Sequence, residues 1–222
     1  MELDLGGGLL LRTVVAADAP LLVEATSGEP GTALWGPYPV GPYSLADARA
    51  ALSAWEQQIC VGVLRDDRLL GAVGLMPDQP GSVEVAYWVR PEQRGQGIAT
   101  RAVRAATEWA HDGLGVPRAW LEIRPDNEPS LRLARRVGYR FEERIAQHCR
   151  DWATEDPAQD TWHDCLIWVH TDEFGLVPPL PRAGVGQTDA SGIGTMQSCP
   201  LPRTKRALDA GGLGSRGNAV RR

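Results

Sequence analysis

The sequence has very little lysine, no closely spaced cysteines and no long apolar run. Lys205 is the only lysine among 23 basic residues, a bias that we attribute to genome composition rather than to function. Zinc sites usually use pairs of cysteines on one turn, and Cys60, Cys149, Cys165 and Cys199 form no C-x-x-C pair, so we expect no bound metal. No segment approaches the roughly 20 apolar residues of a membrane span, so we expect no membrane partner.

Two further absences narrow the class of protein. The chain has no G-x-S-x-G elbow, which argues against a serine hydrolase of the α/β type. The N-terminus, Met1-Glu2-Leu3-Asp4, is acidic where a secretory signal would be basic. We therefore expect a cytoplasmic protein.

Composition divides the chain into a body and a tail. Hydrophobic residues make up 43% and charged residues 23%, a globular profile, so we expect one domain over residues 1–173. From Gly175 onward there are seven basic residues and two aspartates, so the tail is basic and the body is acidic. An acidic body argues against nucleic-acid binding. Residues 174–222 are rich in glycine and proline and show no apolar periodicity, so we expect a disordered tail; a tail that binds a partner is the alternative.

Predicted strands and helices alternate before the tail. Ser44 and Asp47 form a variant of the capping box, which predicts the start of a helix. Asp66-Asp67 separates two apolar runs and predicts a hairpin, while Gly113 is predicted to end a helix in the left-handed conformation. The expected strands are 9–14, 59–64, 69–75, 83–89, 119–124, 139–149 and 162–170, and the expected helices follow Asp18, Ser44, Gly97 and Asn127.

A glycine loop between strand 83–89 and the following helix is the most informative feature. It reads Arg94-Gly95-Gln96-Gly97 and opens directly into the helix. The first amides of a helix have no partner within it, and the helix dipole makes that end positive. Glycines let the backbone approach a bulky anion. The loop matches neither the dinucleotide-binding G-x-G-x-x-G pattern nor the P-loop, but it predicts an anion site suited to a pyrophosphate.

Two motifs carry a resemblance to a known family. Arg94 to Ala99 resembles the R/Q-x-x-G-x-G/A signature of the GCN5-related N-acetyltransferases, the GNAT superfamily. Asn127-Glu128-Pro129-Ser130, followed by Gly138-Tyr139, resembles the second half of that family's site. The register is most similar to the RimJ/RimL branch, which acetylates protein N-termini and includes small-amine acetyltransferases. The resemblance covers about residues 10–170.

The resemblance implies an α/β fold with a mixed, mostly antiparallel central sheet flanked by helices, the acyl-CoA N-acyltransferase fold. Strands 83–89 and 119–124 would splay apart around the pantetheine arm of acetyl-CoA, and the glycine loop would hold its pyrophosphate. A backbone N–H near Val89 would stabilise the oxyanion. The cofactor-binding residues that the resemblance implies are Trp88, Val89, Arg94, Gly95, Gln96, Gly97, Ile98, Ala99, Thr100, Asn127 and Ser130.

Glu84 and Ser130 are the candidate catalytic residues. Glu84 lies mid-strand between two valines, where partial burial would raise the pKa of a carboxylate toward a useful range for a general base; a solvated glutamate is the alternative. Many family members carry a tyrosine seven residues after the asparagine as general acid, but this chain has Ala134 there. Ser130 is therefore expected to donate to the thiolate, unless it only bonds to the backbone of its own turn.

The acceptor pocket is expected to include Trp35, Tyr38 and Tyr43, although aromatic residues beside a sheet are more often packing residues. The sequence thus predicts an N-acetyltransferase that moves an acetyl group from acetyl-CoA to a primary amine by direct attack in a ternary complex. The amine is a protein N-terminus or a small molecule. The alternative is a catalytically silent acyl-CoA-binding sensor or scaffold. The acceptor, the length of the acyl group and the oligomeric state stay open, a homodimer included.

Overall fold

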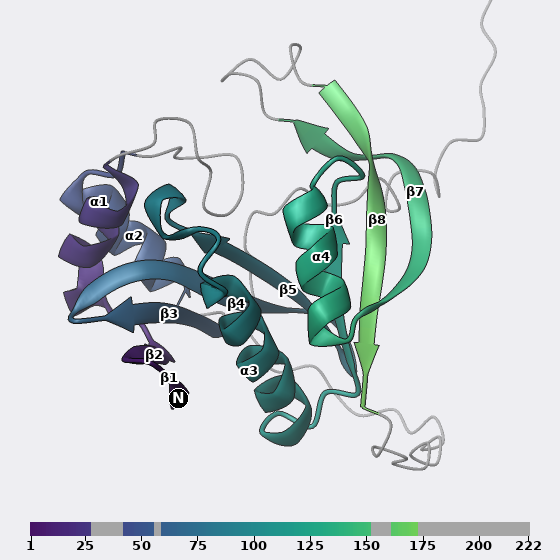
Figure 1. The fold of residues 1–222 in the computed structure, drawn as a ribbon. Helices are drawn as coiled ribbons and strands as arrows, with labels where there is room; N and C mark the ends of the chain where they lie inside the picture. Colours follow the sequence, from purple (N-terminus) through teal and green to yellow (C-terminus); the bar gives the residue numbers. More distant parts are fainter. Residues whose placement is uncertain (28–41, 56–58, 152–160, 173–222) are drawn as a thin grey trace, which may run out of the picture.

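The sheet contains eight strands in the order β1-β2-β3-β4-β5-β6-β8-β7 (Figure 1). The structure, a computed structural model, describes residues 1–27, 42–55, 59–151 and 161–172. Neighbouring strands are antiparallel except β5 and β6. The expected mixed α/β class is therefore confirmed. The strands are β1 (Glu2–Gly6), β2 (Leu9–Thr13), β3 (Ile59–Arg65), β4 (Arg68–Gln79), β5 (Ser82–Val89), β6 (Arg118–Ile123), β7 (Arg140–Asp151) and β8 (Thr161–Thr171). The helices are α1 (Ala19–Thr26), α2 (Leu45–Trp55), α3 (Ile98–Asp112) and α4 (Glu128–Val137), with short 3₁₀ turns at Ala16–Asp18 and Pro91–Gln93.

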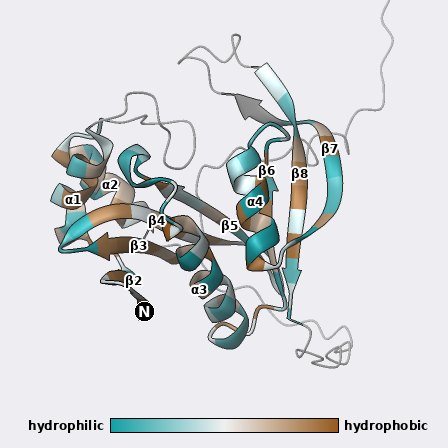
Figure 2. Cartoon of the chain, in the orientation of Figure 1, coloured by the Kyte–Doolittle hydropathy of each residue, from teal (hydrophilic) through white to brown (hydrophobic). Residues whose placement is uncertain are grey.

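Alternate residues of the central strands pack into two separate cores, one on each face of the sheet. Val61 and Val63 of β3 pack with the apolar side of α3, whereas Cys60 and Leu64 pack with α1 and α2. Because side chains alternate across a strand, α1 and α2 cover one face of the sheet, and α3 and α4 cover the other. Figure 2 shows the apolar colouring concentrated on the central strands, while α4 is largely hydrophilic on the side in view.

Several local signals in the sequence form the structures that they predict. Ser44 Oγ accepts a hydrogen bond from the Asp47 amide at 3.2 Å, and the Asp47 carboxylate accepts one from the Ser44 amide at 3.0 Å. Asp66 and Asp67 both have positive φ, +49° and +57°, as a two-residue hairpin turn requires. Gly138 ends α4 at φ +107°.

The predicted left-handed cap at Gly113 is wrong. Its φ is −89°, and the positive φ of +63° occurs two residues later, at Gly115. Glycine is required at position 113 for another reason: a Cβ there would lie 2.6 Å from Trp109 Nε1 and 2.9 Å from the Trp109 carbonyl oxygen. Close packing against Trp109 therefore selects the glycine.

Some expectations fall on residues outside the described ranges. These are the tail at 174–222 and the aromatic residues Trp35 and Tyr38. The strand β1 was not expected from the sequence. Among the described residues, every helix is too short or too polar to cross a membrane.

Candidate active site

A fork between β5 and β6 forms the centre of the candidate site. The parallel ladder has only three residue pairs, the last being Glu84 with Trp120, although β5 continues to Val89 and β6 to Ile123. Beyond the fork each strand keeps its antiparallel partner, β4 or β8. The Arg90 amide donates to the Leu70 carbonyl of β4 at 2.8 Å. Because amides alternate along a strand, that of Val89 points the other way, into the gap.

The glycine loop and the start of α3 form a backbone nest at the open end of this fork. Gly95 and Gly97 have φ values of +78° and +75°, which favour glycine, and both are exposed. A Cβ added at either position would meet no atom within 4 Å, so the space in front of the backbone is open. No side chain caps the amides at the start of α3. An exposed, uncapped helix start flanked by glycines fits a pyrophosphate.

The side chains of the loop hold the loop in place. Arg94 Nε donates to the Val89 carbonyl at 3.0 Å, which ties the loop to the end of β5. Gln96 lies on the surface, where its amide contacts Gln93 at 3.4 Å. Ile98 is buried in the core. Ala99 and Thr100 are half-buried on the first turn of α3. In this loop the backbone amides are therefore better placed than the side chains to bind an anion.

Glu84 lies at the fork on the face opposite α3. Val83 and Val85 on either side of it pack into the α3 core. Burial, and then the charges of Glu122 and Asp78, raise the pKa of Glu84 to about 8. The alternative of a freely solvated glutamate therefore does not describe this carboxyl.

Glu122 is a second carboxyl on the same face, and it was not expected from the sequence. The pairing of Glu84 with Trp120 puts these side chains on one face, and Glu122 is two residues further along β6. Burial raises the pKa of Glu122 to about 7. His148 Nε2 lies 3.3 Å from the Glu122 carboxylate. The alternation of Ala119, Leu121 and Ile123 carried the signal, because it leaves Glu122 on the opposite face.

Ser130 lies in the first turn of α4, across the gap from β5. Its amide donates to Asn127 Oδ1 at 3.2 Å, so Asn127 caps the helix as expected. Tyr87 reaches across from β5 and donates from its hydroxyl to Ser130 Oγ at 2.9 Å. Tyr87 was not expected from the sequence, because no local pattern links residues 43 positions apart. Ala134, where many family members have a tyrosine, is fully buried.

The aromatic residues of the site have different positions. The side chain of Trp88 packs beside the α1–α2 core, on the same face as Glu84. Its indole N–H and that of Trp120 are buried, and neither has a hydrogen-bond partner among the described residues. Tyr43 is only 6% exposed and belongs to the same core, where its amide donates to Thr26 Oγ1 at 3.1 Å. Its position is that of a packing residue, and Trp35 and Tyr38 lie outside the described ranges.

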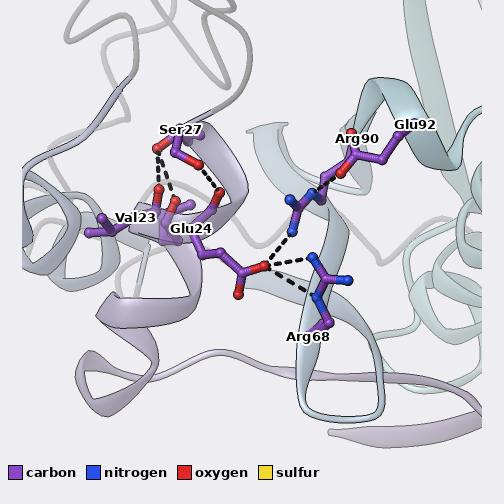
Figure 3. Close-up of polar contacts among 8 residues, drawn as sticks. Val23, Glu24, Ser27, Arg68, Arg90 and Glu92 are labelled. Carbon is purple, nitrogen blue, oxygen red and sulfur yellow. Dashed lines mark hydrogen bonds and ion pairs between the residues drawn. The ribbon is translucent and has the colours of Figure 1, made fainter.

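An ion-pair network joins the end of β5 to α1 (Figure 3). Glu24 Oε1 accepts from Arg68 Nη2 at 2.7 Å and from Arg90 Nη1 at 3.1 Å. Arg90 also contacts Glu92 through Nε at 2.6 Å. The Arg90 side chain is only 11% exposed, so these two carboxylates balance a nearly buried charge. The network fixes Arg90, which precedes the 3₁₀ turn that leads into the glycine loop.

The described residues contain no cluster of three or more His, Cys, Asp or Glu side chains arranged to hold a metal ion. The site consists of a backbone nest, a splayed pair of strands, a carboxyl whose pKa is raised by burial and a hydroxyl pair across the gap. Such an arrangement can bind a diphosphate, pair with an extended amide-containing arm, and accept a proton near the place where that arm ends.

Known proteins resemble this chain in sequence and in fold. Residues 8–140 match the family described as the acetyltransferase (GNAT) domain. The probable N-acetyltransferase YjcK of Bacillus subtilis (strain 168) is 32% identical over 80 residues, which are 35% of this chain and 44% of that protein. The uncharacterized N-acetyltransferase YoaA of the same strain is 25% identical over 148 residues, 63% of this chain and 84% of that protein. The chain thus spans less than half of YjcK.

The solved structures agree in fold. The ribosomal-protein-S5-alanine acetyltransferase of Vibrio fischeri has a TM-score of 0.66 at 16% identity, covering 78% of this chain and 98% of that one. The ribosomal L7/L12 α-N-protein acetyltransferase RimL, solved with coenzyme A, has a TM-score of 0.64 at 17% identity, covering 77% and 98%. The family match extends over more than half of the 222 residues and includes the fork, the nest and α4. The chain belongs to the GNAT acetyltransferase family and is an acyltransferase.

Proposed function

We propose that this protein transfers an acetyl group from acetyl-CoA directly to a primary amine, in a ternary complex, as a RimJ/RimL-like enzyme. The single observation that carries the proposal is the fork at Glu84 and Trp120, with the glycine nest at its open end. Pantetheine would pair with the unpaired backbone of β5, as an added strand pairs with a sheet edge. The Val89 amide, which points into the gap, would then face the thioester carbonyl.

The pKa of Glu84 supports an amine acceptor. An ammonium has no lone pair, so the amine must lose a proton before or during attack. A base works best with a pKa near the working pH, and burial raises the pKa of Glu84 to about 8. An α-amine has a pKa of about 8, whereas a lysine amine has one near 10.4, so Glu84 is better matched to an α-amine. Acceptors of this kind are protein N-termini and small molecules with an amine of similar pKa.

The acidic face supports a cationic acceptor. Glu84 and Glu122 lie on one side of the sheet, and both have raised pKa values because burial disfavours their charged forms. An ammonium placed between them would stabilise the two carboxylates in their ionised forms, because an opposite charge within a few ångströms favours the charged form of a carboxyl. In the reaction, Glu84 accepts the proton of the amine that attacks, and Ser130 donates a hydrogen bond to the departing sulfur.

Three measurements test the proposal. Titration with coenzyme A measures binding to the nest, and release of free thiol from acetyl-CoA is measured with a panel of peptides and small amines. Glu84→Gln should lower kcat at least 100-fold and leave the Kd of coenzyme A within about twofold, because a positioned general base contributes roughly 10²–10⁴-fold. Glu143→Gln is the matched control, an exposed glutamate on β7. Tight binding without transfer to any acceptor would favour an acyl-CoA sensor, and no binding at all would refute both functions.

A further inference from the structure

The hydrogen bond between Tyr87 and Ser130 crosses the gap that the pantetheine arm would enter. Tyr87 comes from β5 and Ser130 from the first turn of α4, and the distance between their oxygens is 2.9 Å. The ring of Tyr87 packs against the core on the α3 face, which fixes the direction of its hydroxyl. The pair therefore lies on the opposite face of β5 from Glu84, with the fork between them.

The direction of this hydrogen bond determines what Ser130 can do. Tyr87 donates, so Ser130 Oγ is the acceptor and keeps its own proton for a third group. A serine in a first helical turn often donates to a nearby backbone carbonyl. Here no described residue accepts a hydrogen bond from Ser130 Oγ; its amide bonds to Asn127 instead. The Ser130 proton is thus available to a ligand.

Tyr87 is suited to remain the donor. Burial raises the pKa of its hydroxyl above the ordinary value near 10, and the hydrogen bond to Ser130 opposes only part of that shift. The phenol therefore keeps its proton throughout the pH range of an enzyme assay. A hydroxyl that accepts a hydrogen bond becomes a stronger donor through its own proton.

We propose that Tyr87 is a positioning residue that holds Ser130 with its proton directed at the sulfur of the departing coenzyme A thiolate. This inference rests on the proposed function. It assigns a task to a tyrosine on β5 in a chain that has Ala134, a buried core residue, at the position of the family's common phenol.

The atoms balance without proton transfer from either hydroxyl. The amine nitrogen attacks the carbonyl carbon of the thioester and a C–N bond forms. The tetrahedral intermediate then collapses: the C–S bond breaks and its electron pair goes to sulfur. The amine that attacks is neutral, having lost its ammonium proton to solvent, and the proton that its nitrogen gives up in the intermediate goes to Glu84. The thiolate accepts a hydrogen bond from Ser130 Oγ–H, and that oxygen accepts one from Tyr87.

Kinetics with two kinds of leaving group test the assignment. Tyr87→Phe removes only the hydroxyl. We expect kcat with acetyl-CoA to fall about tenfold, less than the 10²–10³-fold loss typical of a donor that touches the developing charge, and KM for acetyl-CoA to stay within about twofold. The acetyl thioesters of N-acetylcysteamine and of thiophenol are then compared through kcat/KM. The alkyl thiolate needs stabilisation and the aryl thiolate needs little, so the alkyl ester should lose about tenfold and the aryl ester less than about twofold.

Tyr139→Phe is the matched control. Tyr139 is a buried tyrosine, and its hydroxyl is hydrogen-bonded to Thr107 Oγ1 at 2.7 Å instead of to Ser130. Its removal should affect both thioesters equally or not at all. In Ser130→Ala, adding Tyr87→Phe should cause no further loss, because Tyr87 acts only through Ser130.

The possible failures are distinguishable. Equal losses with both thioesters in Tyr87→Phe, or additive losses in the double variant, would overturn the role of Tyr87 and leave the transferase function standing. If the wild-type chain binds coenzyme A but releases no thiol with any amine, the proposed function and this inference both fall.

Discussion

Glu84 should make the stability of this protein fall as the pH rises. The carboxyl lies at the fork of β5 and β6, where burial and the charges of Glu122 and Asp78 raise its pKa from 4.5 to about 8. In the unfolded chain the same group has an ordinary pKa and loses its proton at a pH several units lower. Between these values the folded state holds one more proton than the unfolded state.

The sign and magnitude of the effect follow from this difference. The folded state is favoured fully below the unfolded pKa, and the advantage is lost progressively as the pH rises toward the folded pKa. One bound proton corresponds to about 1.4 kcal/mol per pH unit. For a shift from 4.5 to about 8, the loss approaches roughly 5 kcal/mol. Glu84→Gln has no proton to release at this position, so its unfolding free energy should lack this part of the slope.

The assay is urea denaturation of the wild-type chain and Glu84→Gln at several values between roughly pH 5 and pH 8. The difference in unfolding free energy between the two proteins should change by about 1.4 kcal/mol per unit, in favour of the variant at higher pH. Glu143→Gln, an exposed carboxyl on β7, should run parallel to the wild type. Parallel curves for Glu84→Gln and the wild type would mean that Glu84 is solvated in the folded state. Glu84 would then lack the raised pKa that a general base needs near neutral pH.

Three other perturbations test neighbouring parts of the site. Glu122→Gln removes a charge that raises the pKa of Glu84, so the acidic limb of the kcat/KM profile should move to lower pH; an unmoved limb would show that the two carboxyls do not interact. Gly97→Ala should weaken coenzyme A binding at least tenfold in a titration, because a methyl group would enter the space in front of the nest at φ +75°. Gly115→Ala is the control for that variant, because Gly115 also has a positive φ, +63°, and open space around it. It should lower the unfolding free energy by about 1–2 kcal/mol, as Gly97→Ala should, without changing the Kd of coenzyme A. Glu24→Gln should lower the unfolding free energy by about 1 kcal/mol and raise KM for acetyl-CoA a few-fold, since Arg90 precedes the loop; a KM equal to that of the wild type would limit the network to stability.

The parts of the fold that the sequence predicted are those with local causes. Asp66-Asp67 forms its turn because two short polar residues adopt positive φ between apolar runs. Asn127 caps α4 and Gly138 ends it, each through contacts within one helical turn. The glycine nest belongs to the same class, because its backbone conformation is a property of Gly95 and Gly97 themselves. Motifs of this kind can be found without knowing what lies beside them.

The parts that the sequence did not predict depend on register between strands. The hydrogen bond from Tyr87 to Ser130 joins two elements 43 residues apart, and it depends on where α4 crosses β5. Glu122 joins the site only because Glu84 pairs with Trp120, which puts their side chains on one face. A pattern of alternation gives the face of a residue within its own strand but not the residue opposite it. Gly113 was misinterpreted for a similar reason, since its cause is contact with Trp109.

The candidate site lies where the pairing between β5 and β6 stops. The strand β5 is held along its length by β4, and β6 by β8, so neither needs the other as a partner. Where their ladder ends, the amides of β5 that face the gap lose their partners in the sheet, and unpaired backbone amides favour a ligand that can pair with them. Glu84, the last residue of that ladder on β5, lies close to both strands, and burial there raises its pKa. Residues just after it face the gap, which is why Tyr87 can reach Ser130. One interruption of the sheet therefore creates both the unpaired edge of β5 and the two sides of the proposed reaction.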